Sequence, residues 1–408
     1  MREVWIIDAA RTPRGIGKPG KGALCEIHPQ RMLSAVLDAL ATRCNLNTAD
    51  IDDVVIGCGA QYQKQGNCIA KMAALDAGYD ITVPGVSIER FCGSGLSAVN
   101  IGVMGVASGM QDLVVAGGVE SMSQTPMNLE MMDSGNLHLR QKYPQVHQGL
   151  AGDMLATLND ISREDVDNLA LESQRRAQHA IENAYFENSL IPVCGDDGNV
   201  ALAVDEYPRP STTRTSLAAL EPAFARFCEA PLDDKGLSFA SMMRETWPQV
   251  TINHVHHAGN SSGIVDGAAA VALASKDYAQ KNGLLPRAKV LIATTAADCP
   301  MLMADAPTPA TRKALAKTGM SIDDIDLIEI NEAFAAVPIK FMRDFDLDDT
   351  RVNVNGGAIA LGHPIGATGA ILLGTLLDEL ERRDLETGLV TLCAAGGMAP
   401  ATIIQRCG

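Results

Sequence analysis

The spacing of apolar residues changes repeatedly along the chain and predicts an alternation of helices and strands. From residue 30 to residue 43, apolar side chains recur every three or four positions, which places them on one face of a helix. Short apolar runs at 54–56, 86–88 and 113–116 are typical of strands buried on both faces. In the second half, strands are predicted at 325–330 and 389–393, and helices at 332–343 and 366–383. The pattern favours a layered α/β fold.

Three pairs of segments match in the same order along the chain, which predicts a duplicated unit. Two of the pairs are separated by 274 residues and the third by 279. The pairs are 51–57 with 325–331, Gly95 with Gly369, and 113–118 with 392–397.

Residues 121–254 differ from both halves, because they hold many prolines and polar turns and little strand pattern. One helix is predicted among them, from Ser162 to about Phe186, since Ser162 and Asp165 have the spacing of a capping box. A long irregular segment inside a compact protein typically has a function, for example as a lid. The sequence therefore predicts a functional insertion in the first half.

The composition narrows the class of protein. The chain has 408 residues, 47% apolar and 20% charged, as expected for a soluble protein of two or three packed units. Its net charge of -16 argues against nucleic acids and anionic membranes, although helix N-termini can still bind a small anion. We find no apolar run of membrane-spanning length and no signal peptide before the strand-like residues 4–7. The ten cysteines form no CxxC pair, so we predict reduced thiols, no zinc site and a cytoplasmic location.

Cys92 lies in the stretch ERFCGSGLSA, between a predicted strand and a helix predicted over 95–109. A thiol at a helix N-terminus is favoured as the thiolate, which is the nucleophilic form. Gly93 and Gly95 permit a sharp turn there. The alternative for Cys92 is a buried structural cysteine.

Three further positions suit a reaction at a cysteine. His363 lies between glycines and a proline on a loop, where it can serve as the base, or simply be a hydrogen-bonded turn residue. Cys393 ends a predicted strand, and the backbone N–H groups of the turn that follows can form an oxyanion hole. Asn331 and Glu332 are predicted to begin a helix at a strand end, a common site position in α/β folds. For the last two positions, the pattern also fits a purely structural role.

Two other motifs compete with this interpretation. Residues 15–20 read GIGKPG, formally a GxGxxG motif of a nicotinamide-dependent dehydrogenase, but Pro19 lies inside it and no helical pattern begins there. His254, His256 and His257 suggest a metal, but no matching carboxylate or cysteine spacing accompanies them, which favours a polar loop.

Taken together, four blocks resemble the motifs of the thiolase family: Cys92-Gly93-Ser94-Gly95, Asn331-Glu332-Ala333-Phe334, Gly362-His363-Pro364, and Cys393 in its small-residue turn. Similar stretches at 11–13, 118–123, 259–263 and 266–269 extend the resemblance over the whole chain. It implies a five-layer αβαβα sandwich of two duplicated halves with an inserted loop domain. The implied boundaries are 1–121 plus 255–279 for the N-terminal half, 122–254 for the loop domain, and 280–408 for the C-terminal half.

The resemblance also implies roles. Cys92 would attack the carbonyl carbon and carry the acyl group, His363 would take the proton of Cys92, and Cys393 would exchange the proton next to the acetyl-CoA carbonyl. Asn331 would hold a water that forms one oxyanion hole with His363. The backbone of Cys92 and of the turn at Ala395 would form the other. Candidate contacts for coenzyme A are Ser262, Arg209, Ala333 and Phe334.

Three stretches depart from the family pattern. Ala395 replaces the first glycine of a Cys-x-Gly-Gly-Gly turn, and would be strained if its φ had to be positive. Residues 149–155 read GLAGDML where the family often has Met-Gly-x-Thr-Ala-Glu. Residues 226–250 look inserted, and His256 and His257 replace smaller residues. We therefore predict an acyl preference that is not limited to acetoacetyl-CoA.

The predicted function is thiolase activity: acyl-CoA plus acetyl-CoA in reversible exchange with 3-ketoacyl-CoA plus CoA, by a ping-pong route. CoA thioesters are the substrates, no cofactor is permanently bound, and a homodimer or homotetramer is expected. Four alternatives remain: an acetoacetyl-CoA-specific acetyltransferase, a ketosynthase, an NAD-dependent dehydrogenase, and a noncatalytic acyl-CoA-binding protein. A ketosynthase would normally have a histidine in place of Asn331 and would lack Cys393.

Overall fold

Two copies of one strand arrangement form the core of the molecule, which the computed structural model describes for residues 1–125 and 133–407. The first copy has the strand order β4 (Gly85–Ile88), β3 (Asp53–Gly57), β5 (Leu113–Ser121), β8 (Val265–Ser275) and β1 (Val4–Arg11), and the short β2 (Gly15–Ile16) pairs with β8. The second copy has the order β10 (Leu327–Ile330), β11 (Thr387–Thr391), β12 (Met398–Arg406) and β9 (Ala288–Ala297).

The two copies have the same strand directions as well as the same order. In each copy the strands on one side pair in parallel, and the next two pairs are antiparallel. A short bridge between Ile328 and Val352 stands where β4 stands in the first copy. β1 and β9 also pair, so that both copies join in one ten-stranded sheet.

From β3 to β5 the duplication has an offset of 274, which corrects one of the three sequence matches. Asp53 pairs with Val114 in the first copy, and Leu327 pairs with Gly388 in the second, so both partners are shifted by 274 residues. The predicted pairing of 113–118 with 392–397 is therefore wrong by five residues. Both the end of β5 and the turn after β11 are rich in small residues, which made the two segments look alike.

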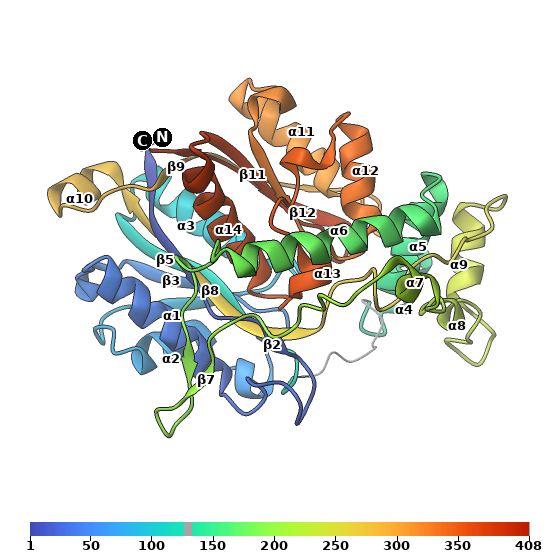
Figure 1. The fold of residues 1–408 in the computed structure, drawn as a ribbon, viewed down its shortest axis with the longest axis horizontal. Coiled ribbons are helices and arrows are strands. Elements are labelled where there is room, and N and C mark those ends of the chain that lie inside the picture. Colours follow the sequence, from blue (N-terminus) through green and yellow to red (C-terminus); the bar gives the residue numbers. More distant parts are fainter. Residues whose placement is uncertain (126–132, 408) are drawn as a thin grey trace.

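Helices cover both faces of each sheet copy and form five alternating layers (Figure 1). The outer helices are α1 (Pro29–Arg43) and α2 (Ile69–Asp76) on the first copy, and α11 (Pro307–Thr318) and α12 (Ala336–Asp344) on the second; the central ones are α3 (Ser94–Ser108) and α14 (Thr368–Arg383). The α/β sandwich predicted from the sequence is therefore confirmed. Shorter helices are α10 (Lys276–Lys281), α13 (Ala358–Leu361), η1 (Thr48–Asp50), η2 (Gln63–Gln65), η3 (Ile322–Asp324) and η4 (Asp349–Arg351).

Alternate residues of a strand pack into different layers, which explains the continuous apolar runs of the sequence. In β1, Trp5 and Ile7 pack with the outer helices, whereas Val4 and Ile6 pack with the central helices. A strand that is covered on both faces has no polar side. The hydrophobic core is thus divided by the sheet into an outer part for each copy and a shared central part.

The two central helices meet through glycines at equivalent positions. A Cβ on Gly95 of α3 would lie 2.5 Å from the carbonyl oxygen of Gly366, and one on Gly369 of α14 would lie 2.3 Å from the amide nitrogen of Leu96. A side chain at either position would therefore push the helices apart. By length and composition alone, residues 91–108 could cross a membrane, contrary to our reading of the sequence; in the fold, 61% of this segment is buried, and α3 is a core helix.

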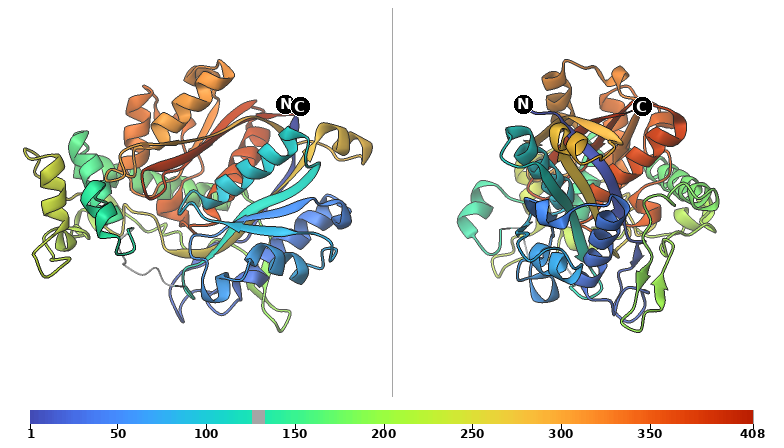
Figure 2. Two further views of the ribbon diagram at one scale, coloured as in Figure 1. Left: turned by 180° about the vertical axis from the view of Figure 1, so that it is seen from behind. Right: turned by 90° about the vertical axis from the view of Figure 1, so that its left-hand side faces the viewer.

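The segment between β5 and β8 adds no strand to the main sheet within its described part, residues 122–125 and 133–264 (Figures 1 and 2). The predicted capping box of Ser162 and Asp165 is present and begins the longest helix of the segment. The elements are α4 (Leu137–Lys142), α5 (Gln148–Leu158), α6 (Arg163–Glu182), β6 (Val193–Cys194), β7 (Val200–Leu202), α7 (Arg214–Ala218), α8 (Ala225–Cys228) and α9 (Phe239–Thr246). The predicted domain boundaries remain predictions.

Candidate active site

Cys92 lies in a tight turn between β4 and α3. Phe91, just before it, has φ of 47°, a left-handed conformation that is unusual for a residue with a bulky side chain. The Ser94 hydroxyl stabilises this turn, because it donates to the carbonyl of Phe91 (2.6 Å) and accepts from the amide of Arg90 (2.8 Å). The helix begins two residues after Cys92, so the predicted position before a helix N-terminus is observed. The turn conformation at Phe91 had no signal in the sequence.

Cys393 begins the turn that joins β11 to β12. Ala394 and Met398 exchange two backbone hydrogen bonds across this turn, of 2.7 and 3.1 Å. The positive φ angles fall on Gly396 (76°) and Gly397 (74°), and Ala395 is not among the residues with positive φ. The backbone strain considered for Ala395 is therefore absent from the turn.

The two cysteine turns touch each other. A Cβ on Gly93 would lie 3.4 Å from the Cβ of Ala394 and 3.0 Å from the Cδ of Pro400. Residues that directly follow Cys92 and Cys393 are thus neighbours in space, although they are about 300 positions apart in the sequence. Cys92 is half-buried and Cys393 is fully buried. The fold therefore brings a reachable thiol beside an enclosed one.

Both thiols are held in the protonated form. Burial raises the pKa of Cys92, and the neighbouring Cys393 and Glu120 raise it further. Burial also raises the pKa of Cys393, to about 12. The sequence predicted that the helix N-terminus would favour the Cys92 thiolate, whereas desolvation of the charged form raises the pKa of this thiol in the folded protein.

His363 is a neutral base with a defined tautomer. Its Nδ1 lies 2.6 Å from the Thr368 hydroxyl, which itself donates to the carbonyl of Pro364 at 2.9 Å. The hydroxyl proton is thus in use, so Nδ1 must be the donor and Nε2 carries the free lone pair. Burial, and secondly the charge of Arg14, lower the pKa of His363 to about 3. At neutral pH the imidazole is uncharged and can accept a proton at Nε2.

Asn331 lies beside that nitrogen. Its Nδ2 is 3.4 Å from His363 Nε2, and its Oδ1 is buried with no partner among the described residues. An orphaned carbonyl oxygen of this kind suits a bound water or a substrate group. We had predicted that Asn331 begins a helix, and this prediction is wrong. The helix that follows begins only at Ala336, because residues 331–335 form an irregular loop that is bonded to residues 260–262.

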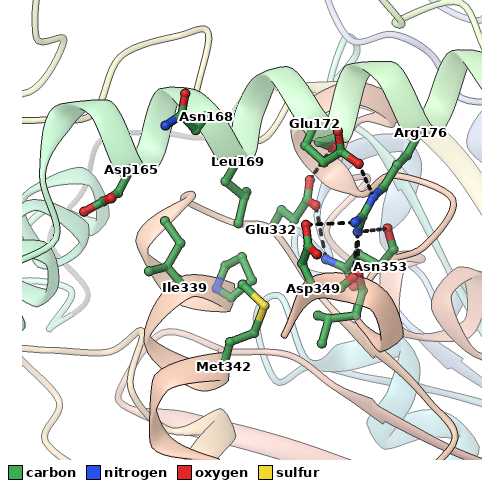
Figure 3. Close-up of a pocket in the computed structure, with 13 residues that line it drawn as sticks. Asp165, Asn168, Leu169, Glu172, Arg176, Glu332, Ile339, Met342, Asp349 and Asn353 are labelled. Atoms are coloured by element: carbon green, nitrogen blue, oxygen red, sulfur yellow. Dashed lines mark hydrogen bonds and ion pairs between the residues drawn. The ribbon is translucent and has the colours of Figure 1, made fainter. Parts of the chain in front are cut away.

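Glu332 fixes the other side of this loop. It accepts from the Ser173 hydroxyl (2.7 Å), the Asn353 amide (3.1 Å) and the backbone N–H of Ile359 (3.1 Å). Figure 3 shows Glu332 among the residues that line a cavity of about 260 Å³ between α6 and α12. Burial raises the pKa of Glu332. Its polar atoms are satisfied by the protein, so it serves to hold the Asn331 loop.

Three of the four candidate contacts for coenzyme A lie together. The amide of Ser262 donates to the carbonyl of Ala333 at 3.0 Å, and Phe334 forms a backbone bridge with Ser261. The fourth, Arg209, lies further out and stacks over the ring of Tyr207, with its guanidinium carbon 4.9 Å from the ring centre. Arg209 also lines a cavity of about 510 Å³ beside Gly259, so this arginine borders the same segment of chain.

The competing motifs are not supported. Gly15 starts a short strand that pairs with β8, and the next α-helix begins only at Pro29, so the glycines do not cradle a helix N-terminus. The sequence motif that suggested a dehydrogenase is therefore not a dinucleotide-binding turn.

His256 and His257 are almost fully buried, which corrects the prediction of a polar loop. Among the described residues no group of histidines, cysteines and carboxylates could hold a metal ion.

The sequence analysis missed two buried charged residues near the site. Glu120, at the end of β5, accepts from the amides of Gly59 and Gly366, both at 2.8 Å, and so ties β5 to the segment before α14. Arg14 is 4% exposed and lies close enough to His363 to affect its pKa. The only sequence signal of a buried role for Glu120 and Arg14 was that each is a charged residue at or near the end of an apolar strand.

Comparison with known proteins decides the family. Residues 4–227 match the family described as "Thiolase, N-terminal domain", and residues 284–406 match "Thiolase, C-terminal domain". The chain belongs to the thiolase family. It is therefore an acyltransferase of that family.

Relatives of this thiolase match it from end to end. A steroid 3-ketoacyl-CoA thiolase of Mycobacterium tuberculosis is 39% identical, with 100% of this chain and 95% of that protein aligned. A beta-ketoadipyl-CoA thiolase of Pseudomonas aeruginosa is 36% identical, with 99% of both chains aligned. The crystal structure of human mitochondrial 3-ketoacyl-CoA thiolase superimposes with a TM-score of 0.86 at 32% identity and covers 100% of this chain and 99% of its own. The family resemblance inferred from the four motif blocks is confirmed.

Proposed function

We propose that this thiolase cleaves and forms 3-ketoacyl-CoA thioesters through an acyl-enzyme at Cys92. The observation that carries the proposal is the geometry of the site: the turns of Cys92 and Cys393 lie side by side, and His363, held by Thr368, presents Nε2 beside Asn331. Burial keeps both thiols and the imidazole uncharged there. A thiol needs a base before it can attack, and a departing carbanion needs an acid. The resting site provides both without any prior proton transfer.

The first half of thiolysis follows from these states. His363 accepts the proton of Cys92 at Nε2 while the sulfur attacks the 3-keto carbon of the substrate. The carbon–carbon bond then breaks, and the leaving enolate of acetyl-CoA takes a proton from the thiol of Cys393. Acetyl-CoA departs, and the site is left with an acyl thioester on Cys92, an imidazolium at His363 and a thiolate at Cys393.

The second half restores the resting site. Free CoA gives its thiol proton to Cys393 and attacks the acyl carbon, and Cys92 leaves as a thiolate that takes the proton of His363. Oxygens that become negative in these steps need preorganised donors. Asn331 with His363 offers one set, through a water on the orphaned Oδ1 side of the amide, and the backbone N–H groups of Cys92 and the turn at Ala395 offer the other.

The proposed substrates are 3-ketoacyl-CoAs with acyl groups other than the simple four-carbon one. Two relatives named for large or acid-bearing acyl groups, a steroid and beta-ketoadipyl, support this choice. The insertion at 226–250 also contributes apolar side chains, among them Phe227, Met242 and Met243, to the core cluster that includes Cys393 and Phe334. Coenzyme A would contact Ser262, Ala333, Phe334 and Arg209, and no cofactor would remain bound between turnovers.

Thiolysis rates on a panel of 3-ketoacyl-CoAs test the proposed substrate class. We expect kcat/KM to be higher for long-chain, branched or cyclic acyl groups than for acetoacetyl-CoA. A profile that peaks at four carbons would support the alternative, an acetoacetyl-CoA-specific acetyltransferase, which is the activity in the name of another relative and of a similar solved structure.

We further propose a cytoplasmic homodimer or homotetramer that binds no nucleic acid and does not insert into membranes. The edge strand β4 supports self-association, because its outer side has no partner among the described residues and apolar residues of β4, α2 and α3 are exposed beside it: Val86, Met72, Leu75, Ile101 and Met104. The ten free cysteines fit a reducing compartment. Light scattering coupled to size-exclusion chromatography tests the assembly, and a monomer at micromolar concentration would refute it.

A further inference from the structure

The carboxylate of Asp153 is buried in α5 and collects four hydrogen bonds from one short segment. It accepts from the rings of His254 (2.7 Å) and His256 (2.9 Å), and from the backbone amides of Val255 (3.2 Å) and His256 (3.0 Å). Burial alone would raise the pKa of Asp153, but the hydrogen bonds from His254 and His256 outweigh it and keep the pKa below its ordinary value. Asp153 therefore stays charged and anchors residues 254–256 to the inserted segment.

His256 passes this anchorage on to the second half of the molecule. Its Nδ1 faces Asp153, and its Nε2 lies 3.4 Å from the backbone N–H of Ala336, which donates to it. Both contacts are satisfied together by one tautomer, with the proton on Nδ1 and the lone pair on Nε2. Ala336 is the first residue of α12, and Ala335 before it offers no side-chain cap. His256 thus supplies a cap that the local sequence lacks.

The capped helix end belongs to the loop that begins at Asn331. Two backbone hydrogen bonds run beside the His256 contact: the amide of Ala335 donates to the carbonyl of Asn260 (3.1 Å), and the amide of Ser262 donates to the carbonyl of Ala333 (3.0 Å). The rings of His256 and Phe334 also meet edge to face, with centroids 5.4 Å apart. Residues 256–262 therefore lie along residues 333–336 and hold them in place.

We propose that the Asp153–His256 pair positions Asn331 against His363, so that the insertion controls the geometry of one oxyanion hole. The inference rests on the proposed function, because it gives Asn331 a part in turnover. His256 is a positioning residue, since it contacts the loop and not the reacting atoms. Two stretches that depart from the family pattern, 149–155 and His256-His257, meet at this contact, which gives both departures a common purpose.

Substitutions at His256 can separate its two bonds. In His256→Asn the shorter amide reaches Asp153 but not Ala336, whereas in His256→Gln the amide oxygen takes the place of Nε2 and still accepts from Ala336. His254→Asn is the matched control, because His254 bonds the same carboxylate through the same ring atom, and no contact with residues 331–336 is found for it among the described residues. Each variant is assayed for kcat and KM in thiolysis and for its melting temperature.

We expect His256→Asn to lower kcat about tenfold with less than a twofold change in KM, because displacement of an oxyanion-hole group by a fraction of an ångström affects the transition state more than binding. His256→Gln, which keeps the acceptor for Ala336 but loses the bond to Asp153, is expected to recover only part of kcat, and His254→Asn to stay near the wild type. If His256→Asn does not fold, His256→Met, which has no comparable acceptor, takes its place beside His256→Gln. Equal losses in the His254 and His256 variants would overturn the inference.

A double-mutant cycle shows whether the effect passes through Asn331. In an Asn331→Ala background, His256→Asn should change kcat by less than about twofold, since a positioning residue has no effect once its target is gone. A full tenfold loss in that background would overturn the positioning role while leaving thiolase activity intact. A wild-type protein without thiolysis of any 3-ketoacyl-CoA would overturn the proposed function itself, and the two failures are therefore distinguishable.

Discussion

The two halves share one backbone plan but place different side chains at equivalent positions. Cys92 before α3 corresponds to Gly366 before α14, and Asn331 directly after β10 corresponds to Gly57 at the end of β3, both at the offset of 274. Neither glycine has room for a side chain: a Cβ on Gly57 would lie 2.3 Å from the backbone of Ser94, and one on Gly366 would lie 2.5 Å from a backbone oxygen of β5. The two halves have similar backbones, and the close packing at Gly57 and Gly366 determines which of the equivalent positions can carry a reactive side chain.

The halves also differ in how one connection is built. In the second half, β11 and β12 are joined by the short turn that holds Cys393. In the first half the equivalent strands, β5 and β8, are separated by the whole inserted segment. One copy thus uses this connection for a reactive thiol, and the other uses it for a segment that reaches across to the Asn331 loop.

The largest expected effect is the loss of the thiol that has no counterpart in the second half. Cys92→Ala should lower kcat by about 10⁴-fold or more, because no acyl-enzyme can form. Single-turnover labelling with acetyl-CoA measures the amount of acyl-enzyme directly, and steady-state assays measure kcat. Cys68→Ala, at an exposed cysteine, is the control and should keep full labelling. An acyl label on Cys92→Ala would remove the assigned role.

Gly366→Ala examines the equivalent position in the other half, where packing rather than chemistry should suffer. The added methyl would press on the β5 backbone and on Cys58, whose Cα would be 2.8 Å away. We expect about 3 kcal/mol lower free energy of unfolding. Urea titration measures it, with Gly283→Ala as a control at an open position, where only the strain of a positive φ, about 1 kcal/mol, is expected. An unchanged midpoint for Gly366→Ala would show that the two halves tolerate side chains equally.

Thr368→Val and Ser94→Ala compare the hydroxyls at the start of the two central helices. Thr368 accepts from His363 Nδ1, so its loss should free the imidazole to adopt the wrong tautomer and lower kcat about 30-fold. Ser94 supports the backbone of the Cys92 turn and should affect stability as well as kcat. Steady-state kinetics with parallel melting curves separate the two results. Full activity of Thr368→Val would contradict the tautomer assignment.

A further expected effect, absent at neutral pH, is a loss of stability in acid. The pKa of His363 is about 3 in the folded protein, against about 6.5 in an unfolded chain, so between these values only the unfolded chain binds the proton. The free energy of unfolding should therefore fall by about 1.4 kcal/mol per pH unit as the pH drops from 6.5 towards 3, and level off below. Denaturant midpoints of the wild type and His363→Asn measure it. Parallel curves for the two proteins would argue against a buried neutral imidazole.

The features that were predictable from the sequence are those written into local spacing. The apolar runs of β3, β5 and β10, the helix beginning at Ser162 and the order of Cys92, Asn331, His363 and Cys393 needed no knowledge of distant contacts. The offset of 274 was also recoverable where residue types were distinctive, and it failed in the run of small residues at 392–397.

The features that could not be predicted depend on contacts between distant segments. The start of α12 at Ala336 is set by bonds to Asn260 and Ser262, which the local pattern at 331–335 does not contain. The protonation of Cys92 depends on desolvation by the packed fold, whereas the helix dipole that we used is a local property. His256 was assigned to a polar loop because the partner that allows its burial, Asp153, lies about 100 positions earlier in the sequence.

The pairing of β5 with β8 has an evolutionary consequence. The last ladder pair joins Ser121 to Asp266, and Asp266 also accepts from the amide of Ser123, so the insertion leaves and rejoins the sheet at one sealed point. Between Ser121 and Asp266, residues can be gained or lost while the register of β5 and β8 stays fixed, because lengthening an existing loop costs little free energy. Evolution could therefore vary the inserted segment, and with it the acyl groups that are bound, while the sheet and the turns of Cys92 and Cys393 stay unchanged.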